Sequence, residues 1–191
     1  MKPLSLATPH LIIMVGIPGS GKSFFAEHFA TTFNAPFVSH EKISTELAND
    51  NSVDPAIVVR ISNFLLKELL KSRQTIVYEG MTDTRTARQV LTKIARDKGY
   101  EPLLVWVQTE SLAAKQRATK SQRERLHLTD EQFDTILHRF TPPSTLEKPI
   151  VISGKHTYAS QLRIVLKHLA VGRVETVPER KIIEGRHITV R

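Results

Sequence analysis

Eight consecutive residues near the N-terminus have the types and spacing of a phosphate-binding loop. They match the pattern G-x-x-x-x-G-K-[ST] at every fixed position and comprise Gly16, Ile17, Pro18, Gly19, Ser20, Gly21, Lys22 and Ser23. In such a loop the glycines let the backbone wrap around phosphate groups, so that amide N–H groups point at the phosphate oxygens. Lys22 would neutralise β- and γ-phosphate oxygens, and the Ser23 hydroxyl would coordinate Mg²⁺. The pattern predicts a nucleotide-binding site that uses magnesium, and we include the next residue, Phe24, in it.

The flanking residues give this loop the structural context that it needs. The apolar run 11–15 precedes it and is typical of a buried strand, and residues 23–30 have the composition of a helix. A phosphate-binding loop works where a strand ends in a glycine turn that opens into a helix, because the first N–H groups of the helix then face the anion. Both flanks therefore support the assignment over a chance match in a glycine-bearing loop.

Two carboxylates follow predicted strands, at the edge of a parallel sheet where ligands bind. Glu41 lies just beyond the strand predicted over 35–38, and Glu79 follows the strand predicted over 75–78. A carboxylate at the position of Glu41 could accept the proton of an attacking hydroxyl group, and Glu79 could hold Mg²⁺ through a bound water. Glu41 fits equally well as an acid at a helix N-terminus, where the helix dipole stabilises it.

Five basic residues lie close together after the fourth predicted strand: Lys115, Arg117, Lys120, Arg123 and Arg125. Phosphoryl transfer needs cations around the γ-phosphate, ideally on a segment that closes over the site and excludes water. Arginine grips phosphate at two points, which favours Arg117, Arg123 and Arg125 as the catalytic contacts of such a lid. The alternative is a solvated helix face, the usual state of a run of charges. His40 and His127 fit surface or capping positions better than acid–base roles.

Strand and helix patterns alternate along the chain. Apolar runs predict five strands, over 11–15, 35–38, 75–78, 103–107 and 150–152. Apolar residues at helical spacing predict seven helices. Their start and stop signals include Asp54-Pro55, Thr129 and Gly99. The predicted helices cover 23–30, a segment that ends at 46, and 54–72, 85–98, 111–120, 129–139 and 157–169. This alternation predicts an α/β fold with a mainly parallel sheet.

The composition is that of one globular domain, with 191 residues of which 40% are hydrophobic and 24% charged. The chain has no cysteine, which excludes disulfides and thiolate zinc sites. No apolar stretch approaches the roughly 20 residues that span a bilayer, and no signal-peptide pattern is seen, so we expect a soluble, cytoplasmic protein without a membrane partner. The net charge of +8 favours anionic partners, whether nucleic acids, nucleotides or sugar phosphates.

The pattern changes after residue 170. Residues 174–177 and 187–190 alternate in hydrophobicity like edge strands around a basic segment. A β-ribbon, a partner-binding arm and a disordered tail all fit this pattern. We therefore divide the chain into a domain over 1–170 and a basic C-terminal extension over 171–191.

Four stretches together resemble the P-loop kinase family that includes polynucleotide 5′-hydroxyl kinases, zeta-toxin-like kinases and seryl-tRNA kinases. They are the loop 16–23, the segment Val38-Ser39-His40-Glu41, the third predicted strand with Arg88 downstream, and the basic segment 117–125 followed by 140–143 and Glu147. The resemblance implies a three-layer P-loop NTPase fold, with five strands in the order 2-3-1-4-5 between helices and the basic segment as a lid. It also implies a kinase domain over 1–170 that transfers the γ-phosphate of ATP to a hydroxyl acceptor, with Mg²⁺.

The chain departs from this family at two positions. The general base of the family is an Asp after the second strand, and the matching residue is Glu41. The third strand of the family ends in Asp followed by a Thr-Asn-like pair, whereas this chain reads Glu79-Gly80-Met81-Thr82-Asp83. Either Glu79 or Asp83 could therefore lie nearest the metal.

Two classes of function stay open on these residues. One is a kinase, whose acceptor is a nucleic-acid 5′ end or tRNA, as the basic balance favours, or a small sugar-like metabolite. The other is an ATP-dependent switch or adaptor without a dedicated acceptor. The chain has no Asn/Thr-Lys-x-Asp guanine motif, which argues against a GTPase, and its aromatic residues do not interleave with the basic run as in a single-strand stacking platform.

Overall fold

The computed structural model describes residues 8–48, 54–120 and 128–171. Its centre is a five-stranded sheet formed by β1 (His10–Val15), β2 (Phe37–Ser39), β3 (Ile76–Glu79), β4 (Glu101–Gln108) and β5 (Ile150–Ser153). The strand order is β2-β3-β1-β4-β5, and each pair of neighbours is parallel. This confirms the predicted order 2-3-1-4-5 and the P-loop NTPase-like fold.

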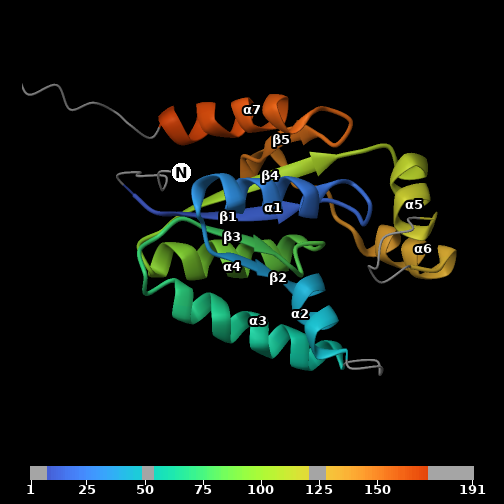
Figure 1. Cartoon of the computed structure of the whole chain (residues 1–191), viewed down its shortest axis with the longest axis horizontal. Coiled ribbons are helices and arrows are strands. Elements are labelled where there is room, and N and C mark those ends of the chain that lie inside the picture. Colours follow the sequence, from blue (N-terminus) through green and yellow to red (C-terminus); the bar gives the residue numbers. More distant parts are fainter. Residues whose placement is uncertain (1–7, 49–53, 121–127, 172–191) are drawn as a thin grey trace, which may run out of the picture.

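Seven α-helices join and follow these strands in the described part of the chain (Figure 1). They are α1 (Lys22–Phe33), α2 (His40–Leu47), α3 (Pro55–Leu69), α4 (Arg85–Asp97), α5 (Ser111–Lys120), α6 (Asp130–Arg139) and α7 (Tyr158–Val171). A short 3-10 turn, η1, covers Thr145–Glu147. Within the described ranges, no helix has the length and apolar character needed to cross a membrane.

Several predicted boundaries differ by a few residues, and two of these shifts have clear local reasons. The second strand begins at Phe37 instead of 35, because Asn34 ends α1 in a left-handed conformation and the amide of Ala35 bonds back to the Ala30 carbonyl at 2.9 Å. The helix predicted to end at 72 ends at Leu69, where the following amides make tighter three-residue turns.

Helices cover both faces of the sheet, which gives three layers (Figure 1). On one face Phe25 and Phe29 of α1 and Val165 of α7 pack against alternate residues of β1, β4 and β5. On the other face Leu66 of α3 and Leu91 of α4 pack against the intervening residues. Because both faces are covered, β1 is buried along its whole length and reads as a continuous apolar run.

The loops that follow the strands meet at one edge of the sheet, and α5 and α6 lie beyond it (Figure 1). A third apolar cluster holds these two helices to the phosphate-binding loop through Ile17, Ala114 and Phe133. A capping box at Thr129 and Gln132 starts α6, as the sequence predicted. The predicted lid position is thus occupied by α5 and α6 in the described residues.

Candidate active site

The phosphate-binding loop is curled so tightly that two of its glycines are required. Gly16 has φ +148°, and a Cβ atom there would lie 2.7 Å from both the Ser20 hydroxyl and the Val107 carbonyl oxygen. Gly19 has φ +73°, and a Cβ atom there would overlap the backbone of α5 at Ala114. Ser20 is fully buried, and within the described part of the chain its hydroxyl has no hydrogen-bond partner. A buried, unpartnered hydroxyl in an anion cradle fits a phosphate oxygen.

Lys22 lies inside this loop with its amino group surrounded by acids. Its Nζ donates a hydrogen bond to the Ile17 carbonyl at 2.9 Å. Burial lowers the pKa of Lys22, and the charges of Glu79, Glu41 and Asp83 raise it in opposition. The lysine predicted to bind phosphate therefore lies at the strand ends, within electrostatic reach of all three candidate carboxylates.

Glu79 and Ser23 form a direct contact at the end of β3. The Ser23 hydroxyl donates to Glu79 Oε1 at 2.7 Å, and the Glu79 residue is only 7% exposed. Burial raises the pKa of Glu79, and the charge of Lys22 and the Ser23 hydrogen bond lower it in opposition. The second oxygen, Oε2, is buried and has no hydrogen-bond partner in the described residues. An unsatisfied carboxylate oxygen beside a serine hydroxyl fits a divalent cation held with the help of substrate phosphates.

Asp83, the alternative to Glu79, is engaged elsewhere. Arg139 Nε of α6 lies 2.6 Å from Asp83 Oδ2, and the Asp83 carbonyl accepts from the Thr141 amide at 2.8 Å. Asp83 therefore ties the end of α6 to the loop after β3, while Glu79 contacts Ser23. The geometry favours Glu79 as the residue nearer a metal. Across the described ranges no group of three or more His, Asp or Glu side chains could hold a metal without substrate.

Glu41 is placed by the direct passage from β2 into α2. Ser39 ends β2 and caps α2, since its hydroxyl accepts from the Lys42 amide at 3.3 Å. Glu41 is thereby in the first turn of α2, so the helix N-terminal interpretation holds. Its charge also raises the pKa of both Lys22 and Glu79. Its role as a base stays a prediction.

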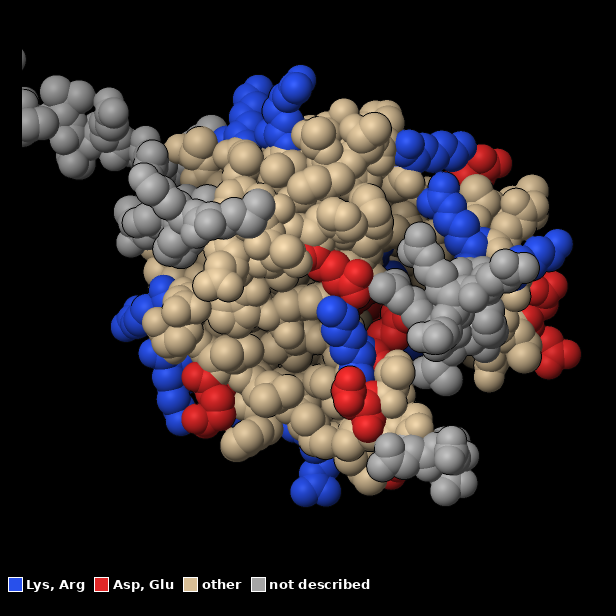
Figure 2. Space-filling model, viewed as in Figure 1, with Lys and Arg blue, Asp and Glu red and all other residues tan. Residues whose placement is uncertain are grey.

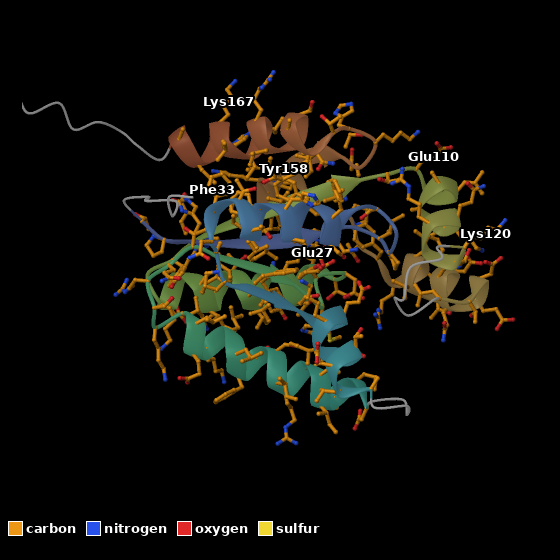
Figure 3. The ribbon with its side chains drawn as sticks, in the orientation of Figure 1. Glu27, Phe33, Glu110, Lys120, Tyr158 and Lys167 are labelled. Atoms are coloured by element: carbon orange, nitrogen blue, oxygen red, sulfur yellow. The ribbon has the colours of Figure 1, made fainter. Side chains whose placement is uncertain are left out.

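Glu27 is an acid at this site that the sequence analysis missed. It lies on the side of α1 that faces β2 and α2 (Figure 3), where its Oε1 is 3.3 Å from Lys42 Nζ. Its charge raises the pKa of Glu79. The signal available in the sequence was its spacing of four residues from Ser23, which places both on one side of a helix.

The basic segment is only partly within the described residues. Arg117 Nη1 on α5 donates to the Gly154 carbonyl at 3.3 Å, near the phosphate-binding loop. The Ser20 carbonyl of that loop accepts a hydrogen bond from the Thr109 hydroxyl at 3.0 Å. Lys115 instead pairs with Asp134 of α6 at 2.8 Å and joins the two helices. Arg123, Arg125 and His127 lie outside the described residues, as does the extension 172–191.

A cavity of about 540 Å³ lies beside the phosphate-binding loop. Its walls come from Ile17 of the loop, the ends of β4 and β5, and the end of α6. Lys155 and Glu110, paired at 3.3 Å, both line it. Figure 3 shows Glu110 just before the start of α5 and Lys120 at its end, beyond the strand ends. The cavity offers room for a group attached to phosphates in the loop.

Arg88 and Glu147, which the sequence analysis noted separately, form a buried ion pair. Arg88 Nε and Nη2 donate to the two Glu147 oxygens at 2.7 and 3.1 Å, and the arginine side chain is 0% exposed. Nη1 donates to the carbonyls of Thr82 and Thr141 at 3.0 and 2.9 Å. The hydrogen bonds from Arg88 hold the pKa of Glu147 below its usual range. One side chain thus fixes α4, the loop after β3 and the segment after α6.

His40 lines a second cavity, which lies between α3 and α4. Its Nε2 lies 3.0 Å from the Tyr78 hydroxyl, and Tyr78 lines the same cavity. Burial lowers the pKa of His40.

Comparison with solved structures identifies shared folds at low sequence identity. A protein from Chloroflexus aurantiacus provisionally assigned as a kinase has a TM-score of 0.66 at 16% identity, over 84% of this chain and 98% of the other. A gluconokinase from Sinorhizobium meliloti has a TM-score of 0.63 at 18% identity, over 85% and 93%. A sugar kinase from Janibacter has a TM-score of 0.61 at 18% identity, over 86% and 95%. At these identities the likeness shows the fold.

The family is shown by sequence comparison. No curated protein sequence matches the chain. A family model described as an AAA domain matches residues 11–143, well over half of the chain, from β1 through the phosphate-binding loop to the segment after α6. The chain belongs to this AAA-domain family.

Proposed function

We propose that the protein is a kinase that transfers the γ-phosphate of ATP to a hydroxyl group of an acceptor, with Mg²⁺. The observation that carries this proposal is the contact of Ser23 with buried Glu79 beside Lys22, which leaves a carboxylate oxygen without a partner among the described residues. The family match and the fold shared with a gluconokinase and a sugar kinase agree with phosphotransfer.

The donor side of the reaction rests on the loop and the end of β3. Lys22 and the loop amides hold the β- and γ-phosphates of ATP. Ser23 and Glu79 are the residues that would hold Mg²⁺, which supplies positive charge to offset the phosphates. The cavity beside Ile17 is large enough for the nucleoside.

The acceptor side rests on Glu41 and on the arginines of the basic segment. Glu41 accepts the hydroxyl proton while the acceptor oxygen bonds to the γ-phosphorus. The bond between that phosphorus and the β–γ bridging oxygen breaks, and ADP leaves with the bonding electrons. Arg117 stabilises the charge on the transferred group, together with Arg123 and Arg125, whose role stays a prediction.

The face drawn in Figure 2 favours a small acceptor over a nucleic-acid end. On this face the Lys and Arg side chains of the described residues are separated from one another, most of them toward the edge and one near the centre, and form no continuous track. Binding along a polyanion depends on several adjacent basic contacts. We therefore favour a small hydroxyl compound and keep the nucleic-acid 5′ end as the competing acceptor in the test.

Glu41→Gln separates a kinase from an ATP-dependent switch. The amide cannot accept a proton, so we expect the transfer rate to fall by about 10²–10⁴-fold while Mg-ATP binding is retained. Transfer is measured with γ-labelled ATP and mass spectrometry on 5′-hydroxyl RNA, 5′-hydroxyl DNA, simple sugars and a metabolite extract. Glu46→Gln, on the exposed side of the same helix, is the matched control. If the wild-type protein binds ATP and labels none of these acceptors, the kinase proposal is wrong and the switch is favoured.

Glu79→Gln tests whether Glu79 helps to hold Mg²⁺. Removing a group that orients the metal is expected to raise the Mg²⁺ concentration for half-maximal activity by about 10–100-fold. Asp83→Asn should have a smaller effect, because its side chain is bonded to Arg139. Glu68→Gln, exposed on α3, controls for loss of one negative charge. A larger effect of Asp83→Asn than of Glu79→Gln would contradict the assignment.

A further inference from the structure

A second cavity, of about 300 Å³, lies between α3 and α4 on the face of the sheet opposite α1. Leu66 of α3 and Leu91 of α4 form its inner wall and are 1% and 5% exposed. Met81 and Val90 also line it and are 46% and 53% exposed. The cavity is therefore apolar inside, and its solvent-facing rim combines these apolar side chains with Asn63 and Lys67 of α3.

The polar groups at the inner wall carry no charge near neutral pH. His40 Nε2 and the Tyr78 hydroxyl are bonded to each other at 3.0 Å. Burial lowers the pKa of His40 and raises the pKa of Tyr78 to about 12, so the imidazole and the phenol are both neutral at pH 7. Lys67 and Asn63, both exposed on α3, also line the cavity, so its cation and its amide lie toward solvent and not at the inner wall. At the inner wall an uncharged ring would displace water from apolar surface.

The cavity adjoins the candidate catalytic residues through the backbone. His40 and Tyr78 directly precede Glu41 and Glu79 in the chain. The next residue, Gly80, passes so close to this wall that a Cβ atom would lie 2.6 Å from the His40 ring and 2.8 Å from the Tyr78 hydroxyl. The segments that carry the proposed base and metal residue thus also form the end of the cavity.

We propose that this cavity binds an apolar ring of the hydroxyl acceptor. The substrates of this protein would then be alcohols or glycosides that carry such a ring, and not sugars that lack one. That the bound compound is a phosphate acceptor rests on the proposed kinase function. That the cavity binds an apolar ring rests on the cavity alone. Its volume is about twice the roughly 150 Å³ of an engineered apolar cavity that holds benzene. The acceptor hydroxyl would then reach the strand ends near Glu41 while the ring lies between α3 and α4.

The three methionines of the chain provide a direct binding assay on the full-length protein. Met81 lines the cavity, Met14 is fully buried in β1, and the third is Met1. In spectra of protein labelled with ¹³C at the methionine methyl groups, we expect the Met81 signal, assigned with Met81→Leu, to shift saturably with phenyl β-D-glucoside and with 3-phenyl-1-propanol. Methyl β-D-glucoside, which lacks the ring, should leave it unchanged, and Met14 should not respond.

Val90→Glu places a carboxylate at the rim, and burying it against a ring is unfavourable. We expect this variant to weaken binding of the phenyl compounds by about tenfold or more. Gln89→Glu adds the same charge at a neighbouring exposed position of α4 that does not line the cavity, and it should bind like wild type. Thermal unfolding of both variants checks that neither has lost its fold.

Transfer assays on the same compounds separate failure of this inference from failure of the kinase proposal. A saturable Met81 shift without phosphate transfer to any acceptor supports the ring site and counts against the kinase. Transfer to bare sugars or oligonucleotides, with no Met81 shift from either phenyl compound, overturns the ring site and leaves the kinase standing. Equal binding by Val90→Glu and wild type also overturns it.

Discussion

Replacing Lys22 by Met is expected to lower the rate of phosphoryl transfer by about 10²–10³-fold or more. The lysine amino group lies in the phosphate-binding loop, bonded to the Ile17 carbonyl at 2.9 Å, and within reach of three acids. Once ATP is bound, the charge of this lysine would stabilise the γ-phosphate while its bond to the β–γ bridging oxygen breaks. Methionine keeps the length and the apolar packing of the side chain and removes the charge together with the hydrogen bond to the Ile17 carbonyl.

The effect is measured as kcat and KM for ATP under saturating Mg²⁺. Lys71→Met is the matched control, because Lys71, in the turn after α3, is exposed and among the described residues forms an ion pair only with Glu68 of α3. It should keep wild-type rates. A Lys22→Met variant that transfers phosphate within a few-fold of wild type would show that this loop does not act on the γ-phosphate.

Replacing Arg88 by Leu is expected to lower the free energy of unfolding by about 3–5 kcal/mol. Arg88 is fully buried and bonds both oxygens of Glu147, whose side chain is 10% exposed. Without the arginine, Glu147 stays largely buried as an unpaired charge, and the carbonyls of Thr82 and Thr141 lose a donor. Urea unfolding followed by circular dichroism gives this free energy.

Two further variants show whether the loss comes from the unpaired acid. Arg88→Leu combined with Glu147→Leu should recover much of the stability, because a well-packed apolar pair can replace a buried ion pair. Arg85→Leu, exposed on the same helix, should change stability by less than about 0.5 kcal/mol. A double variant as unstable as Arg88→Leu would mean that the carbonyl bonds, not Glu147, account for the loss.

The same pair predicts the pH dependence of stability. The bonds from Arg88 lower the folded-state pKa of Glu147, so its contribution is fully present above the ordinary carboxyl pKa and is lost as pH falls through the lowered value. In Arg88→Leu the largest cause of this lowering is removed and only the hydrogen bonds from Ser144 remain, so we expect acid unfolding to begin at a higher pH than in wild type. Unfolding curves between neutral pH and pH 3 measure the difference.

The loop and the helix starts could be predicted because each depends on short-range signals, whereas the strand order was predicted from the resemblance to P-loop kinases. Gly16 to Ser23 is a contiguous pattern, and Asp54 and Thr129 cap their own helices, accepting from the amides of Ala56 and Gln132. Parallel alternation then leaves few arrangements of five strands.

The contacts between distant segments could not be predicted in the same way. Arg88 and Glu147 are 59 residues apart, and nothing in either segment states that they meet. Lys115 counts as one more cation in a basic run, but the fold places it beside Asp134. The end of β3 decides which carboxylate contacts Ser23. The strand continues through Glu79, and it is Glu79 that accepts the Ser23 hydrogen bond.

The close approach of Gly19 to α5 links nucleotide binding to the position of that helix. A Cβ atom at Gly19 would overlap the Ala114 carbonyl and lie 3.1 Å from the Ala118 amide, so the loop cannot widen toward α5 unless the helix moves. We therefore expect a molecule or modification that displaces α5 to change the affinity of the loop for phosphate. By reciprocity, phosphate in the loop would change the affinity for that molecule by the same factor.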